Sequence, residues 1–155
     1  VYKRQGKVRD LGWDGAGNAT LRDSDVIFFN NLYHRSGNIR LTGDNRTGAG
    51  DGDDEQIIVK LNSLSNDYQK IVFIVQIYEG IKNNQHFGQV DNAFIRAVDA
   101  SGKEMVRFDL SGKGYDQQRS LLFAELVREI NGWKFNALGQ SSASDNFLEW
   151  LKEYV

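Results

Sequence analysis

Short runs of β-branched and aromatic residues, separated by clusters of glycine, limit this chain to a fold built from strands. The clearest runs are residues 57–61 and 70–78, and residues of these types favour an extended backbone. Glycine-rich clusters at 12–17 and 48–52 mark turns between such runs. The 155 residues include no proline, so no proline ring interrupts backbone pairing. We therefore predict an all-β chain folded as a two-sheet β-sandwich.

The hydrophobic pattern indicates how the strands are ordered. Run 70–78 is apolar on both faces, which is typical of a strand through the middle of a core. Two hairpins are also expected, residues 26–30 with 39–41 around a turn at 36–38, and residues 94–98 with 105–108 across Ser101 and Gly102.

Two segments after residue 120 carry their own signals. Leu122, Leu126 and Ile130 fit helical spacing, but Asn131 followed by Gly132 is a strong hairpin signal. We therefore expect a hairpin that continues to residue 137. A short amphipathic helix is expected to close the domain, with Ser144 as its N-cap. Its apolar positions are Phe147, Leu148, Leu151 and Tyr154.

Length and composition favour one soluble domain. The chain is 40% hydrophobic and 12% aromatic, which suits a single core. No linker or repeat divides residues 6–155, and residues 1–5 show no pattern, so we predict one domain at 6–155 after a leader at 1–5. No apolar run approaches the roughly 20 residues of a membrane span, and the start lacks a signal-peptide pattern. We expect a cytoplasmic protein.

Charge and cysteine content exclude several classes of function. Nineteen basic and 21 acidic residues give a net charge of −2, which disfavours non-specific nucleic-acid binding. We predict no nucleic-acid partner. The chain has no cysteine, which removes disulfides, thiolate metal sites and thiol nucleophiles.

The acidic segment 44–55 is the most distinctive part of the sequence. It holds five acidic residues and one basic residue, a net charge of −4. Two carboxylates about 5 Å apart repel by about 3 kcal/mol at an effective dielectric constant of 20, so a compact segment of this kind needs a countercharge. Its ligands are all oxygen atoms, which suit calcium better than magnesium, zinc or copper. A solvated turn without a metal is the alternative.

The segment matches none of the common phosphate or calcium motifs. An EF-hand that starts at Asp44 would need glycine at its sixth position, where Ala49 stands. A phosphate-binding P-loop needs Gly-Lys-Ser/Thr, and the segment has no lysine. Neither an EF-hand nor a nucleotide site is therefore expected.

Several motifs together resemble the bacterial tellurite-resistance TerD family. The acidic motif is Leu-Thr-Gly-Asp-Asn-Arg-Thr-Gly at 41–48 followed by Gly-Asp-Gly-Asp-Asp-Glu at 50–55. Further matches are Asp-Val-Ile-Phe-Phe-Asn at 25–30, Lys-Ile-Val-Phe at 70–73, Phe-Gly-Gln-Val at 87–90, Asn-Ala-Phe-Ile-Arg at 92–96, Phe-Asp-Leu at 108–110 and Trp-Lys-Phe at 133–135. The resemblance runs from Asp25 to the C-terminus.

The resemblance implies a calcium-binding β-sandwich in the cytoplasm that takes part in stress or tellurite resistance. It also implies a complex of stress-resistance proteins, located in the cytoplasm or at the periphery of the inner membrane. Family members begin with a strand-rich section that nothing before residue 25 matches, so we expect this chain to lack that section. Leu-Gly-Trp-Asp at 11–14 resembles one family element that lies unusually close to residue 25 here.

We predict that calcium binds in the acidic segment and orders one end of the sandwich. The predicted ligands are Asp44, Asp51, Asp53 and Glu55, with Asn45 and Asp54 as lesser candidates, Asp25 reaching in from the start of its strand, and glycine carbonyls completing the shell.

Three functions are compatible with these residues. A calcium-dependent binding or scaffold module leads, because the segment has ligands but no companion catalytic set, and no enzyme is expected. A magnesium-dependent phosphoester hydrolase and a purely structural calcium site are the alternatives. A serine hydrolase with Ser120, His86 and Asp91 is a remote fourth, since no Gly-x-Ser-x-Gly motif is present.

Overall fold

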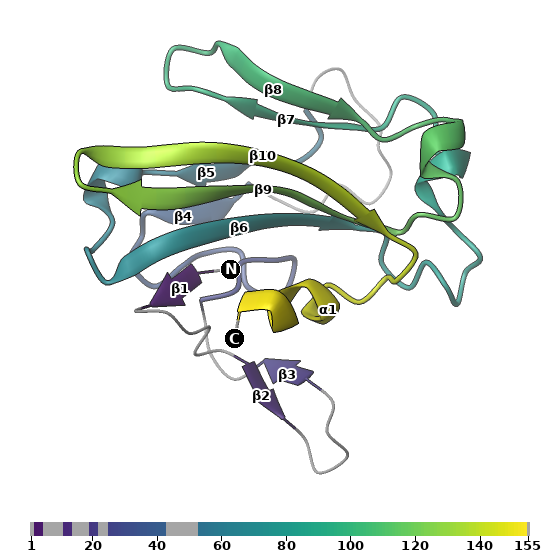
Figure 1. Ribbon diagram of the computed structural model, residues 1–155, viewed down its shortest axis with the longest axis horizontal. Coiled ribbons are helices and arrows are strands. Elements are labelled where there is room, and N and C mark those ends of the chain that lie inside the picture. Colours follow the sequence, from purple (N-terminus) through teal and green to yellow (C-terminus); the bar gives the residue numbers. More distant parts are fainter. Residues whose placement is uncertain (1, 5–10, 14–18, 22–24, 43–52, 155) are drawn as a thin grey trace. The chain divides into compact units, whose positions relative to one another are not determined.

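The computed structural model describes residues 2–4, 11–13, 19–21, 25–42 and 53–154 (Figure 1). Most of its regular elements are strands: β1 (Tyr2–Arg4), β2 (Leu11–Trp13), β3 (Ala19–Leu21), β4 (Ile39–Leu41), β5 (Ile57–Val59), β6 (Tyr68–Gln76), β7 (Phe94–Val98), β8 (Glu104–Asp109), β9 (Ser120–Glu129) and β10 (Gly132–Ser142). One short helix, α1 (Leu148–Leu151), follows β10. The predicted all-β fold with a short C-terminal helix is confirmed.

The strands form one larger sheet and three pairs. The larger sheet has the order β1-β6-β9-β10, and the pairs are β2-β3, β4-β5 and β7-β8. The predicted central strand at 70–78 is β6, shifted to 68–76, and it lies between β1 and β9 in this order. The chain divides into two compact units. Unit 1 contains Val1–Ile71, Val127–Lys134 and Tyr154–Val155, and unit 2 contains Val72–Leu126 and Phe135–Glu153.

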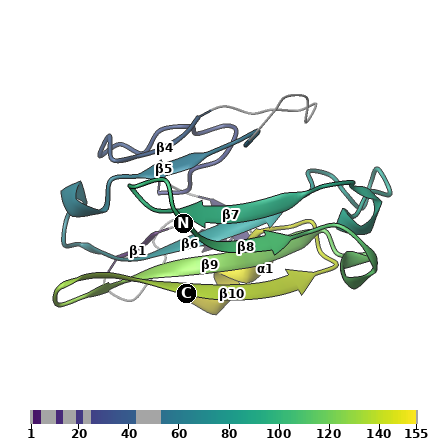
Figure 2. The same ribbon diagram turned by 90° about the horizontal axis from the view of Figure 1, so that it is seen from above.

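The core of unit 2 lies between two layers of strands. Phe87, Leu110, Leu121, Phe123 and Ala124 form its buried cluster. Partly buried side chains pack on this cluster from β6, β7, β8 and β10: Phe73, Val75, Ile95, Ala97, Val106, Phe108 and Phe135. The β7-β8 pair therefore covers one face of the neighbouring sheet (Figure 2). This is the two-layer packing that the predicted sandwich requires.

Unit 1 has its own buried residues, which come from the turns before β4, from β4 itself, from the turn before β6 and from the first half of β6. They are Val26, Ile39, Leu41, Leu64, Tyr68 and Ile71. Arg128 at the end of β9 donates from Nε to the Tyr68 carbonyl at 2.8 Å and from Nη2 to the Leu64 carbonyl at 3.1 Å. This guanidinium therefore ties the start of β6 to the turn that precedes it.

Both of the later hairpins form. Strands β7 and β8 pair from Phe94↔Asp109 to Val98↔Glu104, as predicted. Strands β9 and β10 also form the predicted hairpin, but the turn lies one residue earlier, at Ile130 and Asn131. Gly132 is the first residue of β10 and has φ +143°, a backbone conformation that glycine adopts at little cost.

The predicted strand at 26–30 is wrong. Phe28 and Asn31 exchange two backbone hydrogen bonds of 3.1 and 2.8 Å, which closes a tight turn. The Asn31 side chain donates from Nδ2 to the Val26 carbonyl at 2.8 Å and holds the turn in place. Strand β4 pairs instead with β5, with Leu41↔Ile57 and Ile39↔Val59 in register, and Arg40 also forms an isolated antiparallel bridge with Tyr33.

The C-terminal helix is shorter than predicted, and Ser144 is not its N-cap. Ser144 Oγ accepts from the Asn146 N–H at 3.1 Å, and α1 begins only after Phe147. The Phe147 N–H donates to Gln76 Oε1 at 2.9 Å, so the connection is held by β6 before the helix can begin. Within the described ranges, no helix is long and apolar enough to cross a membrane.

The β7-β8 turn offers a local test of the structure. Asp99 Oδ1 accepts from Ser101 Oγ at 2.6 Å and from the Lys103 N–H at 3.0 Å. The Ser101 hydroxyl is the larger cause, and together these bonds lower the pKa of Asp99. The stabilisation from this ionised carboxylate is therefore present above its unfolded-state pKa and is lost as the pH falls through the lower folded-state pKa.

We expect Ser101→Ala to raise the pKa of Asp99 toward its ordinary value, because the largest stabilising bond to the carboxylate is removed. A carbon-detected NMR titration of the aspartate side chains measures this. Ser65→Ala is the control, since Ser65 Oγ donates to Asp67 at 3.1 Å and not to Asp99. An unchanged Asp99 titration in Ser101→Ala would show that the turn is not closed in this way.

Candidate functional site

The two ends of the acidic segment are joined by hydrogen bonds next to the paired strands β4 and β5. The Thr42 N–H donates to the Gln56 carbonyl at 2.9 Å, and the Gln56 N–H donates to Thr42 Oγ1 at 3.1 Å. These bonds continue the pairing of Leu41 with Ile57. All of residues 43–55 must therefore connect two positions that are hydrogen-bonded to one another.

The predicted ligands fall into two groups. Asp44, Asn45 and Asp51 lie outside the described residues. Asp53 is half-buried, and Asp54 and Glu55 are exposed. Among the residues that the structure describes, no group of three or more His, Asp or Glu side chains could hold a metal ion. The calcium ligands therefore stay a prediction.

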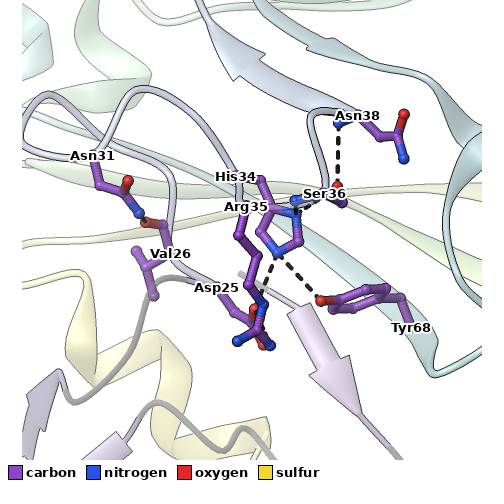
Figure 3. A network of polar contacts seen from close by, with 8 residues as sticks. All are labelled: Asp25, Val26, Asn31, His34, Arg35, Ser36, Asn38 and Tyr68. Atoms are coloured by element: carbon purple, nitrogen blue, oxygen red, sulfur yellow. Dashed lines mark hydrogen bonds and ion pairs between the residues drawn. The ribbon is translucent and has the colours of Figure 1, made fainter.

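Asp25 lies in a different environment from the one predicted. It occupies a turn and not the start of a strand, and it is only 2% exposed. Its Oδ1 atom lies 3.0 Å from His34 Nε2 and 3.5 Å from Arg35 Nη2 (Figure 3). A buried carboxylate requires such partners. Because its carboxylate belongs to this network, we do not carry Asp25 into the proposed calcium shell.

His34 is the centre of the network, and its hydrogen bonds define its tautomer. It is 2% exposed. The Ser36 N–H donates to Nδ1 at 3.2 Å, so Nδ1 carries the lone pair and Nε2 carries the proton. His34 Nε2–H therefore donates to Asp25 Oδ1, and the Tyr68 hydroxyl oxygen lies 3.4 Å from the same nitrogen.

Ser36 completes a line of three polar side chains. Its Oγ lies 2.7 Å from His34 Nδ1, and the Asn38 N–H donates to this oxygen at 3.2 Å. In this tautomer the Ser36 hydroxyl and the Ser36 N–H both face the single lone pair of Nδ1 and share it. The line runs from the exposed Ser36 hydroxyl through the buried imidazole to the buried Asp25 carboxylate (Figure 3).

The serine-hydrolase grouping of Ser120, His86 and Asp91 is wrong. Ser120 is fully buried, and its Oγ accepts from Trp150 Nε1 at 3.0 Å. The carboxylate beside His86 is that of Asp116, with Oδ1 3.5 Å from Nδ1. The Asp25, His34 and Ser36 line was not predicted, because no motif marks it: His34 and Ser36 are two residues apart in a turn, and Asp25 is nine residues before His34.

Comparisons with known proteins agree on one family. The TerD domain matches residues 13–154. Tellurium resistance protein TerX of Serratia marcescens is 64% identical over 97% of this chain and 71% of its own length. Stress response protein SCP2 of Bacillus subtilis (strain 168) is 40% identical over 84% of this chain and 66% of its own length. The crystal structure of a TerD homologue from Streptomyces coelicolor A3(2) shares the fold, with a TM-score of 0.59 at 24% identity, over 74% of this chain and 66% of that one.

Proposed function

The chain belongs to the TerD domain family, and on this basis we propose that it is a calcium-binding stress-response protein of the tellurium-resistance type. In this proposal it acts as a calcium-dependent binding or scaffold module in a complex of stress-resistance proteins, in the cytoplasm or at the periphery of the inner membrane. Relatives named for tellurium resistance and for stress response support the biological setting.

One observation carries the calcium part of the proposal. The acidic segment has a net charge of −4, and hydrogen bonds between Thr42 and Gln56 join its two ends. Closing the segment limits how far its carboxylates can separate, and their repulsion then favours binding of a cation. The proposed ligands are Asp44, Asn45, Asp51, Asp53, Asp54 and Glu55.

Calcium fits this ligand set better than other cations. The oxygen atoms come from carboxylates, an amide and backbone carbonyls, which is the mixture that calcium accepts in six to eight positions. Magnesium prefers an octahedral shell that keeps several waters. In this proposal the ion has no chemical step to perform, and it orders a surface that a partner protein recognises.

We expect calcium to stabilise the protein by mass action, by about 2.7 kcal/mol when free calcium reaches one hundred times the dissociation constant. Isothermal titration calorimetry of metal-free protein gives the stoichiometry and affinity, and thermal unfolding at several calcium concentrations gives the stabilisation. The double variant Asp51→Asn/Asp53→Asn should lose the calorimetric signal and the thermal shift.

The control is the double variant Asp67→Asn/Asp91→Asn, which changes the charge equally at two exposed positions outside the acidic segment. It should titrate calcium as the parent does. An unchanged melting curve in millimolar calcium would contradict the proposal. Turnover of a phosphodiester with magnesium but not calcium would favour the hydrolase alternative, and stabilisation without any calcium-dependent partner would favour a purely structural site.

A further inference from the structure

We propose that Ser36 is an activated nucleophile and that the Asp25, His34 and Ser36 line is a site of acyl transfer from carboxylic esters. This activity is separate from calcium binding and uses none of the proposed calcium ligands. The proposal rests on the direction of the hydrogen bonds, on the contrast in burial along the line and on the exposure of the hydroxyl.

The hydrogen bonds of His34 to Ser36 and Asp25 have the directions that allow His34 to act as a general base. The Ser36 N–H keeps His34 Nδ1 unprotonated, so this nitrogen can accept the proton of the Ser36 hydroxyl, 2.7 Å away. At the other end, Asp25 Oδ1 accepts from Nε2–H at 3.0 Å. This carboxylate orients the ring and stabilises the imidazolium that forms when Nδ1 takes a proton.

Burial of Asp25 and His34 strengthens the electrostatic attraction between the carboxylate and a protonated imidazole. Asp25 and His34 are each 2% exposed, so water screens little of the attraction between the carboxylate and a protonated ring. Ser36 itself is exposed at the turn, and an ester can reach it from solvent. The Asn38 N–H donates to Ser36 Oγ at 3.2 Å and holds this oxygen in the turn.

The line differs from an ordinary serine at a turn. Ser101 Oγ donates directly to the Asp99 carboxylate at 2.6 Å, and Ser65 Oγ donates directly to Asp67 at 3.1 Å. Neither of these bonds passes through an imidazole, and a carboxylate is a weak base for a hydroxyl. These two serines are therefore matched references for Ser36.

Acyl transfer at Ser36 needs only two reactants, the ester and water. Ser36 Oγ attacks the ester carbonyl carbon while its proton moves to His34 Nδ1. The bond from carbon to the leaving oxygen then breaks, and this oxygen leaves as an alcohol with the proton from Nδ1. Water hydrolyses the acyl-serine by the same route in reverse, which releases the carboxylic acid and restores the hydroxyl.

The test is covalent labelling of the full chain with a fluorophosphonate, followed by peptide mass spectrometry. Ser36 Oγ displaces fluoride from phosphorus, so the adduct marks the activated hydroxyl. We expect labelling at Ser36 at least about 100-fold faster than at Ser65 or Ser101, which is the lower end of the contribution of a positioned general base. Acylation of Ser36 by p-nitrophenyl acetate should also release an initial burst of p-nitrophenol.

Variants separate the activated serine from general surface reactivity. Ser36→Ala should remove the adduct and the burst, while Ser101→Ala should keep both. His34→Gln should slow labelling of Ser36 by about 100-fold or more. If that variant does not fold, the rates at Ser36, Ser65 and Ser101 in the parent protein decide the question. Equal labelling of the three serines, or a burst that survives in Ser36→Ala, would overturn the proposal, and neither outcome depends on calcium.

Discussion

Replacing His34 with alanine is expected to lower the free energy of unfolding by about 3–5 kcal/mol, because the change leaves the buried Asp25 carboxylate without its imidazole donor. The His34 side chain is fully buried, so the change also opens a cavity beside Tyr68, whose ring lies 5.3 Å from the imidazole. The turn at Ser36 loses the acceptor of its N–H and hydroxyl as well. Urea unfolding followed by circular dichroism measures the change.

Ser36→Ala is the matched control for His34→Ala. It removes one exposed hydroxyl from the same line and leaves the Asp25 to His34 bond in place, so a loss below about 1 kcal/mol is expected. A loss below 1 kcal/mol in His34→Ala would instead show that Asp25 and His34 are not buried together. The two variants together separate the stabilising role of the buried pair from the chemical role of the exposed hydroxyl.

Replacing Gly139 with alanine is expected to destabilise the protein by about 2–4 kcal/mol, because backbone and packing costs add at this position. Gly139 has φ +66°, a conformation that residues with a Cβ atom rarely adopt. A Cβ placed there would lie 2.6 Å from Cε1 and 2.8 Å from Cζ of Phe108. This ring packs edge to face on Phe123, with the two ring centroids 5.6 Å apart, so moving it away from the added Cβ would disturb that contact.

Gly102→Ala separates the two costs. Gly102 also has a positive φ, +84°, but nothing lies within 4 Å of an added Cβ. Only the backbone cost of about 1 kcal/mol is expected there. Equal losses in the two variants would show that the Phe108 ring does not cover Gly139. Thermal and urea unfolding of the two proteins under the same conditions measure the difference.

The elements that were predicted correctly depend on neighbouring residues. The hairpin of β7 and β8 follows from two short apolar runs around Ser101 and Gly102, and the β9-β10 hairpin follows from the turn residues beside Gly132. The position of the acidic segment between two strands is also evident from the sequence, since strand runs precede and follow it. Local turn chemistry and strand propensity are sufficient in these cases.

The errors occur where a polar side chain takes a backbone group that the predicted element needs. Residues 26–30 have strand-forming side chains, yet Asn31 closes them into a turn by bonding to the Val26 carbonyl. Ser144 is a plausible cap by type, but Gln76 holds the Phe147 N–H and delays the helix. In both places a polar side chain satisfies a backbone group that regular structure would otherwise have used.

The amino-acid sequence by itself determined the strand-rich class of fold, its two later hairpins and the concentration of negative charge between β4 and β5. Only the tertiary structure decided that β4 pairs with β5, and that Asp25, His34 and Ser36 lie in one line. The physical reason is that turn and strand preferences belong to contiguous residues. The partners of His34 depend instead on how the chain packs around the ring, with Asp25 nine residues away and Tyr68 34 residues away, and no local pattern predicts that arrangement.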